Sequence, residues 1–369
     1  MESLFHPSWG YAATVVLTMG GYLLALVLIP RILLDRRDPE ATMAWILAII
    51  FLPYLGAAAF YLLGRTRVRR RTRKKLLARF RVQRSLNTLP ETSPAVDIPP
   101  AGAGREVAKL VRYVTENPLV PGNRVRIFTG GEAAYDQMEA AIESAREHIH
   151  LMSYIFHKDE IGHRFLDLLT QQAERGVEVR LLVDAFGASD LPGSFVKPLI
   201  EAGGRFSRFG PMLGAKRRWR PNLRNHRKIL VVDGRIGFTG GLNIGDEYRG
   251  RKEKWRPWRD THLGLDGPAV RYLQAVFVED WMFSQGEDLA ESRYFPEIPE
   301  QGRELVQVVD SGPDHDHETI HTVFFTAINE ASDRIWITTP YFVPTPAMLL
   351  ALKSAAWRGL DIRILLPGR

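Results

Sequence analysis

The stretch NHRKILVVDG, residues 225–234, predicts a short buried strand that carries two chemically active side chains. Its middle, residues 229–232, is apolar and rich in β-branched side chains, and a glycine after the aspartate marks a turn. His226 and Lys228 stand two positions apart, so on a strand they point to the same face. Asp233 stands seven positions after His226 and therefore points to the opposite, scaffold side.

A histidine beside a lysine suits chemistry on phosphate. The ammonium group neutralises phosphate oxygens, and a neutral imidazole can attack phosphorus or transfer a proton. Repulsion from Lys228 lowers the pKa of His226 and keeps its imidazole neutral. An isolated His-x-Lys pair is more often only the exposed end of a strand, so this interpretation needs support from other residues.

The hydrophobic pattern before this stretch alternates between strand and helix. Strand-like and amphipathic helical segments follow one another at 125–128, 133–146, 148–156, 161–176 and 177–187. Strands that alternate with helices predict an α/β fold with a largely parallel sheet and helices on its faces.

The chain also contains an internal repeat. Residues 141–156 resemble residues 327–342 at an offset of 186, and residues 175–184 resemble residues 358–367 at an offset of 183. Each copy has the order helix, strand, helix, Arg-Gly, strand. The repeat predicts two similar lobes, of which the second stops early.

Two uncharged apolar segments, 7–30 and 41–64, precede the α/β region, and each is long enough to cross a bilayer. Pro53 would kink the second segment without excluding it. Residues 65–81 contain ten Lys or Arg and no acidic residue. The positive-inside rule therefore predicts a multi-pass hairpin with everything after residue 64 in the cytoplasm, and the basic run would contact anionic headgroups.

Composition narrows the function classes. Removing those ten charges from the net charge of +7 leaves −3 for the rest of the chain, so we predict no nucleic-acid partner. The chain has no cysteine, which excludes disulfides, cysteine nucleophiles and zinc–thiolate sites. The predicted regions are two transmembrane helices (1–64), a basic juxtamembrane segment with a Pro/Ala/Gly linker (65–104), a first lobe (105–300) and an incomplete second lobe (301–369).

The spacing His-x-Lys-x4-Asp-x6-Gly-Gly-x-Asn over residues 226–243 resembles the signature of the phospholipase D superfamily. The likeness extends further. The stretches 36–64, 222–248 and 258–281 look like bacterial cardiolipin synthases, and the first of them lies in the apolar hairpin.

This resemblance implies a phospholipase D-like α-β-α sandwich and a phosphatidyltransferase of a bacterial inner (cell) membrane. Members of the family condense two phosphatidylglycerol molecules into cardiolipin and glycerol through a phosphatidyl-histidine, without a metal or other cofactor. His226 would be the nucleophile, and Lys228, Asn243, Gly240 and Gly241 would bind the substrate phosphate. The two glycines would let the backbone approach a bound group closely. The expected partners are phosphatidylglycerol and anionic membrane lipids, and the oligomeric state stays open.

A carboxylate is expected to hold the second ring nitrogen of His226. Asp233 belongs to the predicted catalytic motif, but it faces away from His226. The superfamily usually supplies the carboxylate from a strand just after the Gly-Asn segment, where Asp260 stands, so Asp260 joins the predicted catalytic set. Asp246 and Glu247 are alternative carboxylates for this role, and Asp260 could instead form only an ordinary surface salt bridge.

Superfamily sites contain a second His-Lys pair in the second lobe. His226 lies 51 residues after Arg175, so the repeat would place its counterpart near position 409, beyond Arg369. None of the other histidines has the required spacing, and His262 is interpreted as a strand histidine with satisfied hydrogen bonds.

Three explanations fit a single motif. We favour a C-terminally truncated cardiolipin synthase; the others are pairing of two chains and an inactive membrane-anchored phospholipid binder. A phospholipase D-type hydrolase shares the motif and differs only in passing the intermediate to water. A nuclease is disfavoured by the apolar hairpin and by the charge balance outside the basic run.

Overall fold

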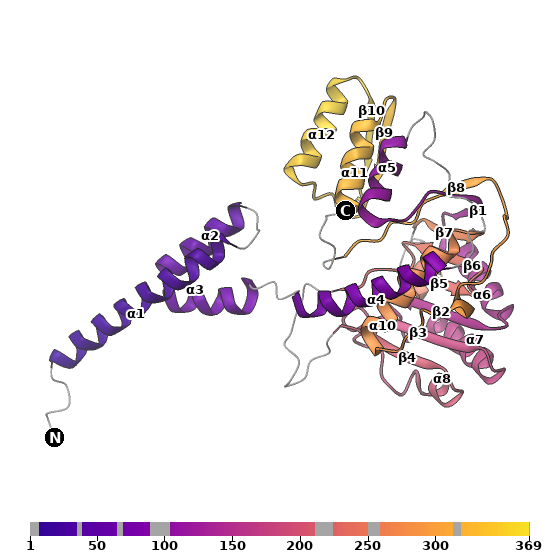
Figure 1. Ribbon diagram of the computed structural model, residues 1–369, viewed down its shortest axis with the longest axis horizontal. Coiled ribbons are helices and arrows are strands. Elements are labelled where there is room, and N and C mark those ends of the chain that lie inside the picture. Colours follow the sequence, from indigo (N-terminus) through magenta and orange to yellow (C-terminus); the bar gives the residue numbers. More distant parts are fainter. Residues whose placement is uncertain are drawn as a thin grey trace. The chain divides into compact units, whose positions relative to one another are not determined.

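The computed structural model divides into two compact units, Met1–Arg70 and Arg71–Arg369 (Figure 1). The ranges that the structure describes are 7–34, 39–64, 69–88, 104–210, 224–249, 259–312 and 319–368.

The first unit consists of apolar helices. They are α1 (Pro7–Leu33), α2 (Pro39–Phe51), α3 (Pro53–Ala59) and the π-helical turn η1 (Phe60–Gly64). Within the described residues, one stretch, Gly10–Leu33, is long and apolar enough to cross a membrane. Pro53 has no N–H to donate to the preceding turn, so the expected span 41–64 is interrupted between α2 and α3. That this second segment also crosses the membrane stays a prediction.

The second unit is built on an eight-stranded sheet with the order β4-β3-β2-β5-β6-β7-β1-β8. The strands are β1 (Val120–Phe128), β2 (His148–Ser153), β3 (Glu178–Asp184), β4 (Arg205–Phe209), β5 (Ile229–Val232), β6 (Ile236–Gly240), β7 (His262–Asp266) and β8 (Glu304–Val306).

The sheet is mixed, and the prediction of a largely parallel sheet is wrong. β3 pairs in parallel with both β2 and β4, as the helices that connect these three strands require. In the rest of the sheet, which continues from β2 through β5, β6, β7 and β1 to β8, each strand pairs antiparallel with the next. For β5 and β6 the cause is the length of the connection. Only residues 233–235 join β5 to β6, and a parallel crossover needs about a dozen residues or more.

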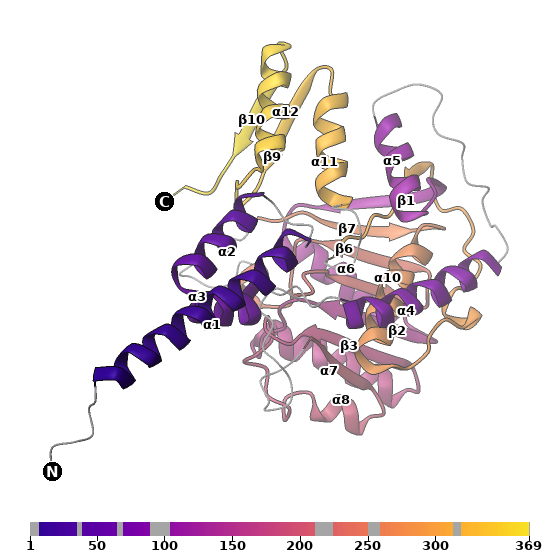
Figure 2. The same ribbon diagram turned by 60° about the vertical axis from the view of Figure 1, so that its left-hand side comes forward.

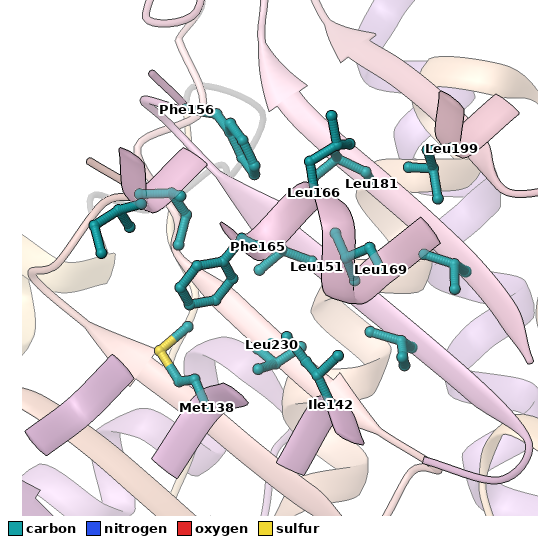
Figure 3. Packing of buried hydrophobic residues seen from close by; sticks show 14 of the residues in the cluster. Met138, Ile142, Leu151, Phe156, Phe165, Leu166, Leu169, Leu181, Leu199 and Leu230 are labelled. Carbon is teal, nitrogen blue, oxygen red and sulfur yellow. The ribbon is translucent and has the colours of Figure 1, made fainter. Parts of the chain in front are cut away.

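Helices cover both faces of the sheet, which confirms the α/β sandwich (Figure 2). The helices of one face are α6 (Gly131–Glu143), α7 (Glu160–Glu174) and α8 (Lys197–Glu201). The helices of the other face are α10 (Val270–Gln285) and α4 (Arg69–Thr88). Figure 3 shows the first core, where side chains such as Met138 of α6 and Phe165 of α7 pack on Leu151 and Leu230 of the sheet. Two separate cores therefore hold the sheet from either side.

The repeat seen in the sequence is present in the fold. The second copy consists of α11 (Thr319–Glu330), β9 (Arg334–Thr338), α12 (Pro346–Trp357) and β10 (Asp361–Leu365). The parallel pair β2–β3 starts at His148 opposite Glu178, and the parallel pair β9–β10 starts at Arg334 opposite Asp361. These four positions are related by the same offsets of 186 and 183 as the sequence repeat.

The helix ends repeat as well. Asp159 caps α7 and Thr345 caps α12, in each case by accepting a hydrogen bond from a backbone N–H three residues on. Gly176 and Gly359 follow the two helices with φ of 89° in both, a left-handed conformation that favours glycine. The Arg-Gly pairs of the repeat are therefore helix ends.

The lobes exchange elements near their predicted boundary. β8 lies after residue 300, yet it pairs with β1 as the last strand of the first sheet. α5 (Arg105–Thr115) precedes that sheet and packs against α11, and Glu330 accepts hydrogen bonds from the backbone N–H groups of Glu106 and Val107. The division into lobes at residue 300 stays a prediction.

Candidate active site

His226 and Lys228 lie at the carboxyl ends of the parallel strands. β5 starts at Ile229, three residues after His226, so both side chains project from the segment just before the strand rather than from the strand itself. Ile229 pairs with Met152 near the end of β2. The crevice outside the carboxyl ends of parallel strands is the usual place for a ligand in α/β sheets.

Tyr154, just after β2, brings the two side chains together. The imidazole of His226 stacks on its ring, with centroids 3.8 Å apart and planes inclined by 19°. Lys228 Nζ lies 5.5 Å from the centroid of the same ring and donates a hydrogen bond of 2.8 Å to the backbone oxygen of His226. The expectation that His226 and Lys228 share one side is confirmed. Sequence reasoning missed Tyr154, although an aromatic residue at the end of a buried strand was visible.

The surroundings of the pair shift both pKa values downward. Burial lowers the pKa of His226 most, Lys228 lowers it further, and Asp184 opposes them. Burial also lowers the pKa of Lys228 to about 8, and Asp260 opposes that shift. A neutral imidazole therefore lies beside an ammonium at neutral pH, which is the combination that attack on a phosphodiester requires.

Asp184 is the carboxylate that acts on His226. It ends β3 and is buried, and its Oδ2 accepts a 2.8 Å hydrogen bond from the backbone N–H of Asn225. Its Oδ1 accepts from two backbone N–H groups of the following turn. Sequence reasoning missed Asp184 because it lies 42 positions before His226, and only the pairing of the strands brings the two together.

Asp260 acts electrostatically on Lys228 instead. Its charge raises the pKa of Lys228, and no contact joins it to His226 among the described residues. The prediction that Asp260 orients His226 is therefore without support from the described contacts and stays a prediction.

The two alternative carboxylates have other roles. Asp246 Oδ1 accepts from the backbone N–H of Ile161 at 2.9 Å, and the backbone N–H of Asp246 donates to Asp159 at 2.7 Å. Glu247 lies 3.7 Å from His157 Nε2. Both residues therefore hold the start of α7 and the loop before it.

The two glycines make room for the segment that carries Asp260. A Cβ on Gly241 would lie 1.9 Å from Asp260 Oδ1, and a Cβ on Gly240 would lie 2.6 Å from His262 Cα. Gly240 has φ of 153°, a conformation that favours glycine. The neighbours that require these glycines are the chain's own residues, and contact of either glycine with a phosphate stays a prediction.

Asn243 is buried and connects the segment after β2 with the short helix α9 (Asp246–Arg249). Its Oδ1 accepts from the backbone N–H of Ile155 at 3.1 Å, and its Nδ2 donates to the hydroxyl of Tyr248 at 2.7 Å. An amide nitrogen carries two hydrogens, so Nδ2 can also donate to a bound oxygen.

Asp233 does not lie at the site. It stands at the far end of β5, where its carboxylate accepts hydrogen bonds of 2.8 to 2.9 Å from the backbone N–H groups of Arg146, Glu147 and His148. The predicted scaffold side is thus correct. The inclusion of Asp233 in the catalytic set is not supported, because a whole strand separates it from His226.

His262 differs from expectation. It is 1% exposed, and neither ring nitrogen has a hydrogen-bond partner among the described residues. Burial lowers its pKa to about 4, with a further contribution from Lys228. A cavity of about 10 Å³ lies beside both side chains, close to the space that one water molecule needs. His262 is a strand residue, as interpreted, because it begins β7, but the expected hydrogen bonds to its ring are absent among the described residues.

Comparison with known proteins agrees with this geometry. Residues 138–254 and 324–369 match the sequence profile of the family described as cardiolipin synthase, PLD-like domain. Residues 23–65 match a profile described as phospholipase D-nuclease N-terminal.

Individual relatives match along most of the chain. Cardiolipin synthase 1 of Bacillus cereus is 37% identical over 355 residues, which cover 92% of this chain and 68% of that protein. The cardiolipin synthase of Geobacillus thermodenitrificans is 38% identical over 376 residues, covering 100% of this chain and 74% of that protein. Among solved structures, phosphatidylserine synthase of Haemophilus influenzae gives a TM-score of 0.49 at 13% identity, covering 71% of this chain and 66% of that one.

Proposed function

The chain belongs to the cardiolipin synthase family with its phospholipase D-like domain, and we propose that it transfers a phosphatidyl group between two phosphatidylglycerol molecules. The observation that carries the proposal is the pair of His226 and Lys228 on the ring of Tyr154. A neutral nucleophile and a cation there face the same space at the carboxyl ends of the strands.

In the first step, a ring nitrogen of His226 attacks the phosphorus of one phosphatidylglycerol. A P–N bond forms, the P–O bond to the glycerol headgroup breaks, and glycerol leaves with a proton. In the second step, a headgroup hydroxyl of another phosphatidylglycerol attacks the same phosphorus. The P–N bond breaks, the hydroxyl proton is released, and cardiolipin forms. The proton taken up in the first step balances the one released in the second.

The neighbouring residues divide the remaining tasks. Lys228 neutralises charge on the phosphate oxygens, and Asp260 supports that role by keeping the pKa of Lys228 from falling further. Asn243 contributes its second Nδ2 hydrogen to a phosphate oxygen. Gly240 and Gly241 permit the close approach of the Asp260 segment. The proposed route needs no cofactor, because the imidazole attacks and the ammonium neutralises.

The apolar first unit supports association with a membrane, where the lipid substrate resides. α1 has the length and composition of a membrane span, and the run of basic residues that precedes Lys75 in the sequence suits an anionic bilayer surface. We propose a multi-pass arrangement with the second unit in the cytoplasm of a bacterial cell, as the charge asymmetry predicts.

The test uses the full chain in vesicles of phosphatidylglycerol, with His226→Asn as the variant and matched melting temperatures as the control for folding. We expect cardiolipin and glycerol in equal amounts from the wild type and none from the variant. A phosphatidyl group attached to His226 should be detectable by mass spectrometry after a short reaction. Equal cardiolipin from both proteins would refute the role of His226. Phosphatidic acid as the sole product would identify a hydrolase.

A further inference from the structure

One buried carboxylate ties three distant parts of the chain together. Asp280 of α10 is 0% exposed and lies on the face of the sheet that carries α4. Its Oδ2 accepts from Arg227 Nη1 at 2.6 Å and from Asn225 Nδ2 at 2.9 Å, and its Oδ1 lies 3.2 Å from Lys75 Nζ. The carboxylate is thus the meeting point of two cations and an amide.

Two of these partners are the residues on either side of His226. The backbone N–H of Arg227 donates to Asn225 Oδ1 at 3.0 Å, which closes a tight turn around His226. Arg227 also pairs with Asp310 at 3.3 Å and donates to the backbone oxygen of Ser311 at 2.9 Å. Asn225 and Arg227 point into the protein, while His226 between them is exposed toward the site.

The third partner, Lys75, comes from α4, which follows the apolar helices of the first unit in the sequence. Lys75 is 5% exposed, unusually buried for a lysine. The same helix is held by a 2.6 Å hydrogen bond from Ser85 to the backbone oxygen of Ala290 and by one of 3.1 Å from Arg79 to that of Thr115. α4 is therefore part of the folded second unit, although its basic residues predicted only a juxtamembrane segment.

We propose that Asp280 is a positioning residue for His226: through Asn225 and Arg227 it fixes the backbone that aims the imidazole, and Lys75 of the juxtamembrane helix holds Asp280 in place. The inference rests on the proposed function insofar as it concerns the reaction of His226. Asp280 itself touches no substrate.

The charge of Asp280 is essential to this arrangement. Burial alone would raise the pKa of Asp280, but Arg227 and Lys75 outweigh it, so the pKa is lowered and the carboxylate stays ionised. Removal of the charge would leave two cations buried without their common partner, which is strongly unfavourable. The turn around His226 would then move, because its two anchors share that carboxylate.

The first experiment compares Asp280→Asn with Glu287→Gln in the full chain in phosphatidylglycerol vesicles. Glu287 follows α10 and binds the buried Arg180 at 2.7 Å, so its variant also removes a carboxylate from a buried cation, but from one without contact to the turn around His226. At a temperature where both variants are folded, we expect kcat of Asp280→Asn to fall at least tenfold with KM within threefold. Glu287→Gln should keep kcat within threefold. Equal kcat losses in the two variants, or no loss in Asp280→Asn, would overturn the proposal.

A second measurement is independent of turnover. Diethyl pyrocarbonate modifies exposed imidazoles, and peptide mass spectrometry reports the rate at His226 alone. If the turn around His226 loses its anchor, the rate at which diethyl pyrocarbonate labels His226 at pH 7 should rise more than threefold in Asp280→Asn. The same rate should stay unchanged in Glu287→Gln. An unchanged rate in Asp280→Asn would refute the positioning role. If His226 is labelled faster in Asp280→Asn but the wild type forms no cardiolipin, the proposed function is refuted and the positioning role of Asp280 is not.

The contribution of Lys75 is tested with Lys75→Met. Arg227 still pairs with Asp280 in that variant, so both effects should be smaller than in Asp280→Asn. We expect a threefold to tenfold loss of kcat and a modest rise in the labelling rate of His226. The double variant Lys75→Met with Asp280→Asn should be no less active than Asp280→Asn alone, because both changes act through one carboxylate. Independent, multiplying losses would refute the link to α4.

Discussion

Replacement of Asp233 by alanine should lower stability and leave the chemistry intact. The carboxylate accepts three backbone hydrogen bonds, of which the one from His148 is partly buried and the other two are exposed to water. Loss of the partly buried one costs about 1–3 kcal/mol, and the exposed donors can bind water instead. Asp233 also has φ of 51°, where alanine adds about 1 kcal/mol of strain. The sum is about 2–4 kcal/mol.

For a unit of this size, about 2 °C per kcal/mol predicts a fall in melting temperature of about 4–8 °C. Asp233→Asn is the matched control, because asparagine tolerates the left-handed conformation and keeps one acceptor oxygen, so its fall should be about half as large. The assay is cardiolipin formation at 20 °C beside a thermal melt. His226→Asn should show the reverse pattern, with lost activity and an unchanged melt. An Asp233→Ala protein with a normal melt and no activity would refute this reasoning.

Further predictions concern the residues around the phosphate. The value of kcat/KM should fall as the pH rises through about 8, because Lys228 then loses its proton, and Lys228→Arg should remove this alkaline limb in a pH–rate profile. Asp260→Asn should shift the limb to lower pH, since the charge of Asp260 raises the pKa of Lys228, and a shift to higher pH would contradict this electrostatic effect. Gly241→Ala should act in the same direction as Asp260→Asn, because the added methyl displaces that carboxylate. Tyr154→Leu should reduce kcat about twofold to tenfold through loss of stacking, whereas Tyr154→Phe should stay close to wild type in the same assay.

Much of the fold could be predicted from the sequence because it depends on local pattern. The alternation of apolar segments located β2, α7 and β3 to within a few residues, and the repeat offsets of 186 and 183 reappear as strand registers. The antiparallel half of the sheet was not anticipated. A short turn sets the direction of β6 relative to β5, but β2 with β5 and β1 with β8 pair across long stretches of chain, and no local pattern sets the direction of such pairs. The interruption at Pro53 was expected only as a kink.

The sequence by itself determined the reacting pair, because His226 and Lys228 are neighbours in the chain and the spacing to Asn243 carries the family signature. The tertiary structure alone decided what surrounds them. Asp184 and Asp280 act on this turn from positions 42 before and 54 after His226, and no local pattern links residues so far apart. They meet only because the paired strands bring chain segments together and the buried face of α10 excludes water. In that setting an ionised carboxylate must be paired, so its partners are fixed in position.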